Sequence, residues 1–167
     1  AERERVLGAD HPDTLTVRSN LASAYDSVGR FGEAIELFEQ VLAERERVLG
    51  ADHPDTLTVR SNLASAYDSV GRFGEAIELF EQVLAERERV LGADHPDTLT
   101  VRDNLAVAYD SVGRLAEVID ALEELLPDCQ RVLGLEHPLT KRVEKNLEAA
   151  KRKMNPPDTP SPETGED

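Results

Sequence analysis

Histidines recur at positions 11, 53, 95 and 137, each directly after an acidic residue. Imidazole and carboxylate groups are common zinc ligands, so this spacing suggests a metal site repeated along the chain. Ligands lie about 2 Å from a zinc ion, whereas in a helical stack equivalent histidines would be separated by two helix layers of about 8 to 10 Å each. We therefore predict that each histidine is held by backbone groups at a turn, with no metal and no other cofactor.

Two further features could indicate catalysis or phosphate binding. Gly29 and Gly32 form a glycine-rich turn around Arg30, but no Lys-Ser or Lys-Thr follows and no strand precedes it, as a phosphate-binding loop requires. Cys129 is the single cysteine, which excludes an intramolecular disulfide, and no base lies at a fixed spacing from it to activate a nucleophile. We predict that the chain is not an enzyme.

Arginines occur at positions 18, 60 and 102, on the apolar side of a helical pattern. An unpaired guanidinium buried there would be strongly destabilising. One hypothesis is an ionic ladder between repeats, in which these arginines pair with glutamates of a neighbouring helix, namely Glu44, Glu46, Glu86 and Glu88. The alternative is that each arginine lies along apolar surface with its head group in water.

The elements that position these residues come from a repeat. Residues 1–42 and 43–84 are identical, and residues 85–126 differ from them at only ten positions. A period between 20 and 50 residues is typical of a solenoid, in which each unit buries its apolar face by stacking on its neighbours.

Each copy predicts two amphipathic helices, since apolar residues recur at spacings of three and four. Pro12 suits a first helical position, Gly29 suits a helix end, and Pro127 inside a second helix predicts a kink or a short break. The first helices are expected at 12–28, 54–70 and 96–112, and the second helices at 31–49, 73–91 and 115–133. The fold class predicted from this pattern is an all-α solenoid of antiparallel helix pairs.

The same pattern divides the chain into units. A basic helix after His137 would give the last unit the polar outer face that a terminal repeat needs, and the proline-rich acidic end could not bury a core. The predicted units are a remnant of a preceding second helix at 1–7, repeats at 8–49, 50–91 and 92–133, a C-terminal capping helix at 134–154, and a disordered acidic tail at 155–167.

The formal net charge is −15, and each perfect copy adds acidic residues. Such a field disfavours nucleic acid and anionic membranes and favours basic or polar partners, although repeated acidity could simply keep a long array soluble. No apolar run approaches the length of a membrane span, and no secretion signal opens the chain. We therefore predict a cytoplasmic protein.

The spacing Arg18-x2-Leu21-Ala22-x2-Tyr25, followed by Ala34-x3-Phe38, resembles the tetratricopeptide repeat. Here Arg18 takes the place of the family's tryptophan, and the period is 42 residues instead of 34. The linker Leu-Gly-x-x-His-Pro-x-Thr is similar to that of kinesin light chain repeats and of bacterial arrays of near-identical repeats. The resemblance implies a right-handed superhelix whose concave face binds peptides.

By this resemblance, residues of the first helices line the concave groove. Asn20, Asn62 and Asn104 match a groove asparagine whose amide can both donate to and accept from a peptide backbone. The aspartates favour a basic or polar ligand over an acidic one, unless they are simply solvated helix ends. The other expected groove residues are Ser23, Ser65, Asp26, Asp68, Asp103 and Asp110.

Two functions remain open at this stage. The principal prediction is a non-catalytic scaffold that binds an unknown protein or peptide. The alternative is a structural module that stacks end to end with other copies through an uncapped N-terminal repeat.

Overall fold

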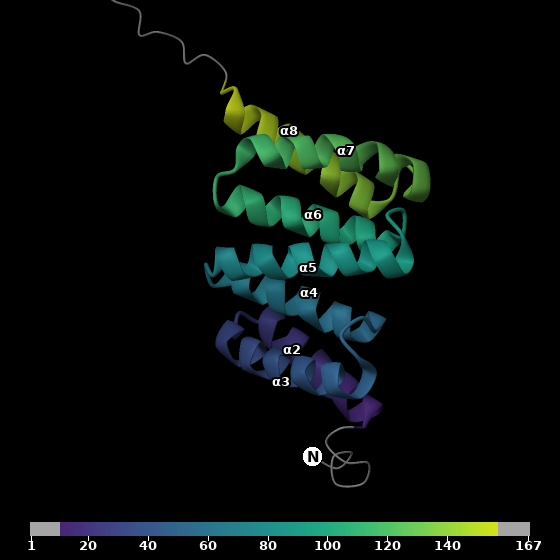
Figure 1. Ribbon diagram of the computed structural model, residues 1–167. Coiled ribbons are helices and arrows are strands. Elements are labelled where there is room, and N and C mark those ends of the chain that lie inside the picture. The colour runs from purple at the N-terminus through teal and green to yellow at the C-terminus, as the bar shows by residue number, and fades with distance from the viewer. Residues whose placement is uncertain (1–10, 157–167) are drawn as a thin grey trace, which may run out of the picture.

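The computed structural model describes residues 11–156, which form helices joined by short turns and contain no strand. The helices stack in chain order, with α2 and α8 at opposite ends (Figure 1). They are α2 (Pro12–Ser27), α3 (Phe31–Leu49), α4 (Pro54–Ser69), α5 (Phe73–Leu91), α6 (Pro96–Ser111), α7 (Leu115–Leu133) and α8 (Pro138–Met154).

The all-α prediction is confirmed, and the helix bounds agree with it closely. The second helices match their predicted ranges, and the first helices end one residue earlier than expected. None of the described helices is long and apolar enough to cross a membrane. The helix remnant predicted at 1–7 and most of the tail predicted at 155–167 lie outside the described residues.

Every first helix begins with the same local structure. In α2 the N-cap is His11, whose Nδ1 accepts a hydrogen bond from the backbone N–H of Asp13 at 3.2 Å. Pro12 occupies the first helical position, where the missing N–H leaves no hydrogen bond unmade. His53, His95 and His137 cap α4, α6 and α8 in the same way. The predicted structural role of the histidines is thus confirmed.

The first helices of the three helix pairs also end alike, in a Schellman motif. Gly29 has a φ of +77°, its N–H donates to Asp26 O at 3.0 Å, and the N–H of Arg30 donates to Tyr25 O at 2.9 Å. The Arg30 guanidinium lies 4.4 Å from the centre of the Tyr25 ring, a cation–π contact across the turn. Gly71 and Gly113 repeat the motif, so each chain reversal produces an antiparallel helix pair.

The core consists mostly of aliphatic side chains between successive helices, with the aromatic residues Phe38, Tyr67 and Phe80 as its largest members. How far a helix contributes buried residues to the core depends on whether another helix packs on each side of it. Val59 of α4 is 0% exposed because α3 packs against α4, whereas the equivalent Val17 of α2 is 46% exposed. Burial of each first helix therefore depends on the second helix that precedes it.

The break predicted at Pro127 is not present, because α7 runs without interruption from Leu115 to Leu133. Pro127 lies on the exposed side of the helix. Water can therefore hydrate the carbonyl that loses its intrahelical partner, and tertiary packing on the buried side holds the helix together.

Candidate functional site

The curvature of the stack follows from which helices touch. Each first helix contacts the next one, in the pairs α2–α4, α4–α6 and α6–α8, whereas no described second helix contacts the next second helix. The first helices are therefore closer together and form the inner, concave face. The second helices are spread apart on the outer face.

Several of the expected groove residues converge on one cavity of the inner face. Ser65, Asp68, Asp103 and Asn104 line a cavity of about 240 Å³, together with Ser69 and with Arg142, which pairs with Asp103. Phe80 and Val107 give it an apolar wall. Asn62 of α4 is partly buried beside this region but does not line the cavity. Three further members lie on α2, where Asn20 and Ser23 are exposed and Asp26 is half-buried, and Asp110 lies on α6.

A second, smaller cavity of about 120 Å³ lies between α6, α7 and α8. Val107 and Asp110 of α6 line it together with Val118 and Leu122 of α7. Val107 borders both cavities and is 42% exposed, whereas the first two copies have serine at this position. The inner face therefore becomes more apolar toward its C-terminal end.

Asp68 brings a poorly solvated carboxylate to the larger cavity. Its Oδ1 is buried and has no hydrogen-bond partner among residues 11–156. Burial raises the pKa of Asp68, and a hydrogen bond with Ser111 offsets this only in part. Burial also raises the pKa of Asp26, the equivalent residue of α2. A desolvated carboxylate gains free energy from an incoming cation or hydrogen-bond donor, so this position favours a basic or polar ligand.

Asp103 lines the same cavity, and its role in ligand binding stays a prediction, but its carboxylate already has partners on α8. Asp103 is 0% exposed, and its carboxylate forms an ion pair with Arg142 Nε at 2.6 Å and accepts a hydrogen bond from Asn146 Nδ2 at 3.2 Å. Asp110 likewise accepts from Lys153 Nζ at 2.5 Å. Both aspartates connect α6 to the last helix, since their basic neighbours Arg142 and Lys153 on α8 stand where the preceding copy has Thr100 and Ser111.

The predicted arginine ladder is present at one position and differs at the other two. Arg60 Nη2 lies 2.6 Å from Glu46 Oε1, as the ladder requires. Arg18 instead donates to Gln40 Oε1 at 2.7 Å, and Arg102 pairs with Asp128 at 2.8 Å.

Arg60 contacts the second helix that precedes it, α3, whereas Arg18 and Arg102 contact the second helix of their own pair, α3 and α7 respectively. Glu44 and Glu86 pair within their own helices with Arg47 and Arg89. Glu88 has no ion-pair partner among the described residues, although it lines an outer cavity beside Arg102.

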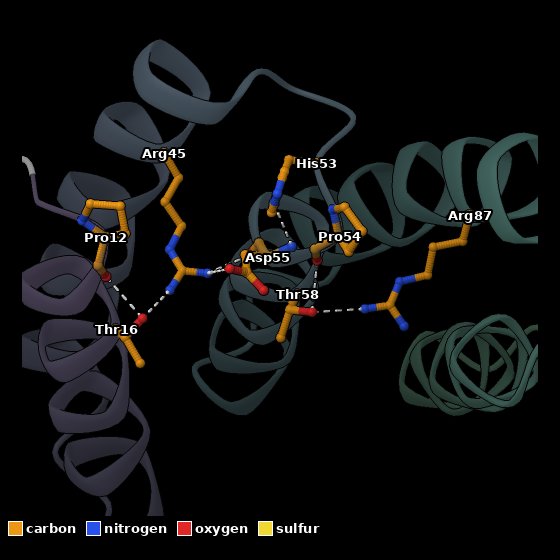
Figure 2. A network of polar contacts seen from close by, with 8 residues as sticks. All are labelled: Pro12, Thr16, Arg45, His53, Pro54, Asp55, Thr58 and Arg87. Atoms are coloured by element: carbon orange, nitrogen blue, oxygen red, sulfur yellow. Dashed lines mark hydrogen bonds and ion pairs between the residues drawn. The ribbon is translucent and has the colours of Figure 1, made fainter.

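Two buried arginines that the sequence analysis did not identify connect consecutive repeats. Arg45 is 6% exposed, and its guanidinium donates to Asp55 O at 2.8 Å and to Thr16 Oγ1 at 3.3 Å. Arg87 makes the same bonds to Asp97 O and Thr58 Oγ1. Figure 2 shows the bond to Thr58 together with both bonds of Arg45. Each of these arginine clamps therefore connects three successive helices.

The third copy replaces the clamp with apolar residues. Cys129 stands at the position of Arg45 and Arg87, and Leu139 stands at the position of Asp55 and Asp97. Both belong to the same buried cluster. The sequence could have revealed the clamp through this paired change, because the arginine and the aspartate are both replaced in the same copy.

The described residues hold no arrangement suited to metal or covalent chemistry. No group of three His, Cys, Asp or Glu side chains within them is placed to hold a metal ion. Burial raises the pKa of the Cys129 thiol to about 11, so it is protonated at neutral pH. The inner face has a cavity lined by amide and carboxylate groups, which can form hydrogen bonds with a ligand.

Comparison with known proteins agrees with this geometry. The tetratricopeptide repeat family model matches residues 1–43, 27–88 and 69–130. A curated relative, Protein KINESIN LIGHT CHAIN-RELATED 2 of Arabidopsis thaliana, is 54% identical over 39 residues, which are 23% of this chain and only 6% of that protein.

Solved structures show the same fold over most of the chain. A variant of a Podosopora anserina putative kinesin light chain with nearly identical TPR-like repeats is 35% identical, with a TM-score of 0.76 over 90% of this chain and 71% of its own. BtubC (BKLC) from P. vanneervenii is 21% identical, with a TM-score of 0.69 over 92% of this chain and 69% of its own. Together with the family model, these likenesses establish that the chain belongs to the tetratricopeptide repeat family.

Proposed function

We propose that the chain is a non-catalytic scaffold for protein–protein interaction, and that its inner face binds an extended basic or polar peptide segment. The observation that carries the proposal is the cavity where Ser65, Asp68 and Asn104 of two successive first helices meet an apolar wall. Nucleic acid and membranes are not the proposed partners, given the net charge of −15. On the sequence grounds given above, the cytoplasm is the proposed location.

Three groups at this cavity have separate tasks in the proposed complex. The Asn104 amide makes no hydrogen bond to another side chain in the described part of the chain, so it is available to donate to and accept from a peptide backbone. Asp68 would receive a lysine, an arginine or a backbone N–H. Val107 and Phe80 would contact an aliphatic side chain of the same peptide.

Solved relatives of this fold support an interaction role in general terms. One is the TPR2B domain of yeast Sti1 in a complex with pHsp70, at 15% identity, and another is the Yersinia enterocolitica type III secretion translocator chaperone SycD, at 20%. These likenesses show only the shared fold. The partner of this chain is therefore argued from its own residues.

Selection of peptides from a random displayed library against the folded chain tests the proposal. Basic or polar sequences should be enriched, and Asn104→Ala or Asp68→Asn should weaken the selected peptides about tenfold, since one backbone or charge-assisted bond is lost. Gln82→Ala is the matched control, because Gln82 is an exposed amide on a second helix. Equal binding by all three variants would place the peptide elsewhere.

The alternative of end-to-end association draws support from two exposed apolar residues on α2. Val17 is 46% and Leu21 45% exposed, whereas the equivalent Val59 and Leu63 are 0% and 3% exposed. Sedimentation over a range of concentrations should show concentration-dependent association if a second copy covers this face, and Leu21→Lys should abolish it. A monomer at every concentration would exclude this function.

A further inference from the structure

A third cavity lies on the outer face, away from the proposed peptide groove. It has a volume of about 440 Å³ and lies between the second helices α5 and α7, over α6. Its apolar lining comes from Leu84, Ala93, Leu105 and Ala121. Its charged lining consists of Glu88, Arg102, Glu124 and Asp128.

One substitution in the third copy makes room at this place. Ala121 stands where the first two copies have Leu37 and Leu79. Leu79 packs against two of the buried clusters, so a leucine here is part of the apolar packing of the preceding interface. Replacing it by alanine leaves space for about the stem of one long side chain.

A second substitution makes the cavity more acidic. Glu124 replaces the glutamine found at positions 40 and 82. At the edge, Arg131 contacts both Asp94 at 2.5 Å and Asp128 at 3.0 Å. In all, four carboxylates (Glu88, Asp94, Glu124 and Asp128) face two guanidinium groups (Arg102 and Arg131), so two negative charges remain uncompensated.

Arg102 leaves the Glu88 carboxylate of the cavity without an ion-pair partner among the described residues. At the preceding interface Glu46 holds Arg60 at 2.6 Å. The equivalent Glu88 has no such partner, because Arg102 turns to Asp128 at 2.8 Å instead. Glu124 also has no ion pair with any residue that the structure describes. These two carboxylates, without an ion pair among the described residues, therefore border the partly apolar cavity of the copy in which the leucine is missing.

We propose that this outer cavity binds a basic side chain, lysine or arginine, presented by a partner protein. The alkyl stem would pack against Leu84, Leu105 and Ala121, and the cationic group would pair with Glu88 and Glu124. The site gives the array a second contact surface that is independent of the inner face, and only the third helix pair carries it.

Amide NMR of the full chain tests the proposal with three small probes: the N-acetyl methylamides of lysine, arginine and citrulline. Citrulline has nearly the shape of arginine but no charge. The two cationic probes should shift the signals of Leu105 and Ala121 in a saturable way, with dissociation constants on the order of millimolar that weaken as salt is added. Absence of saturable shifts, or equal shifts with citrulline, would overturn the proposal.

Two variants that restore the residues of the other copies separate binding from folding. Ala121→Leu fills the cavity and Glu124→Gln removes the added charge, and each residue is already accommodated at the equivalent positions. Each change should weaken the cationic probes by about tenfold. Unchanged affinity in a folded Ala121→Leu chain would show that the probes bind elsewhere.

The converse change tests for a gain of binding. The double substitution Leu79→Ala and Gln82→Glu gives the second copy the same two features. It should create a second binding event, with new shifts in the part of α5 that carries the two substitutions. A folded double variant that binds only one equivalent would show that these two substitutions do not define the site.

Discussion

The Arg87 side chain shows how a cation can occupy a core position with only a distant ion pair and two neutral hydrogen-bond acceptors. Burial lowers its pKa, and the Asp97 carboxylate, 3.9 Å away, opposes this effect only in part. The guanidinium is instead satisfied by the Asp97 carbonyl and the Thr58 hydroxyl. Those acceptors lie on different helices, so one side chain fixes the relative position of three elements.

Replacing Arg87 by cysteine, the residue of the third copy, should lower the free energy of unfolding by about 2 to 4 kcal/mol, since it removes two buried hydrogen bonds and leaves a cavity. Adding Asp97→Leu should restore at least about 1 kcal/mol, because cysteine and leucine form an apolar pair at 129 and 139. Urea unfolding of the two single variants and the double variant measures this coupling. Strictly additive effects would contradict a paired clamp.

The histidine caps predict a smaller effect. His95→Ala removes the acceptor for the Asp97 N–H and should destabilise the chain by about 1 kcal/mol. His95→Asn keeps an N-cap acceptor and should recover most of that loss. Urea unfolding followed by circular dichroism distinguishes them, and equal loss in both variants would mean that the cap contributes through packing instead.

At the scale of the helix, α8 is held by a buried carboxylate. Burial raises the pKa of Asp103 even though Arg142 and Asn146 both oppose the shift. The folded state therefore binds this proton more tightly than the unfolded state. Its contribution to stability is largest at low pH and is lost as pH rises through the raised pKa.

This linkage gives a prediction for Asp103→Asn, which cannot ionise. Relative to this variant, the wild-type chain should lose stability as pH rises above the ordinary aspartate pKa of about 4, because only the wild type must ionise a buried group. Urea unfolding at several pH values gives the difference directly. A difference that grows in the opposite direction would refute the raised pKa.

Helix α7 gives a second prediction at this scale. Pro127→Ala restores the alanine of positions 43 and 85 and one intrahelical hydrogen bond, so it should stabilise the chain by about 1 to 3 kcal/mol. Thermal unfolding measures the gain. Ala85→Pro is the reciprocal test, and it should destabilise by a similar amount.

The sequence predicts features within one helix better than contacts between helices. Helix bounds were predictable because His11, Pro12 and Gly29 act on their own neighbours in the chain. Contacts between helices were less predictable. Arg102 faces two second helices, and nothing in its local sequence distinguishes Glu88 from Asp128. The burial of Asp103 depends on Arg142 of another helix, and the outer cavity depends on three helices at once.

The whole molecule carries many exposed ion pairs but a large excess of negative charge. Pairs such as Arg114–Glu117 are solvent-exposed, and each contributes little stability. The excess charge acts over longer distances along the stack. At low ionic strength, repulsion between repeats should therefore outweigh the surface pairs.

Raising the salt concentration from about 20 mM to about 500 mM should accordingly raise the Tm by a few degrees, since screening removes repulsion. Neutralising three exposed acids, with Glu36→Gln, Glu78→Gln and Asp120→Asn, should raise the Tm at low salt and reduce its dependence on salt. A Tm that falls on adding salt would mean that the ion pairs dominate.

The arginine clamp has a consequence for how such a gene can change. Thr16, Arg45 and Asp55 come from three successive helices, so no single unit carries a complete clamp. Unequal recombination that adds or removes one whole unit between identical copies still brings the same three residues together at the new junction. Array length can therefore vary without any compensating mutation. The junction of Cys129 with Leu139 is the exception, and it confines such changes to the part of the array that precedes it.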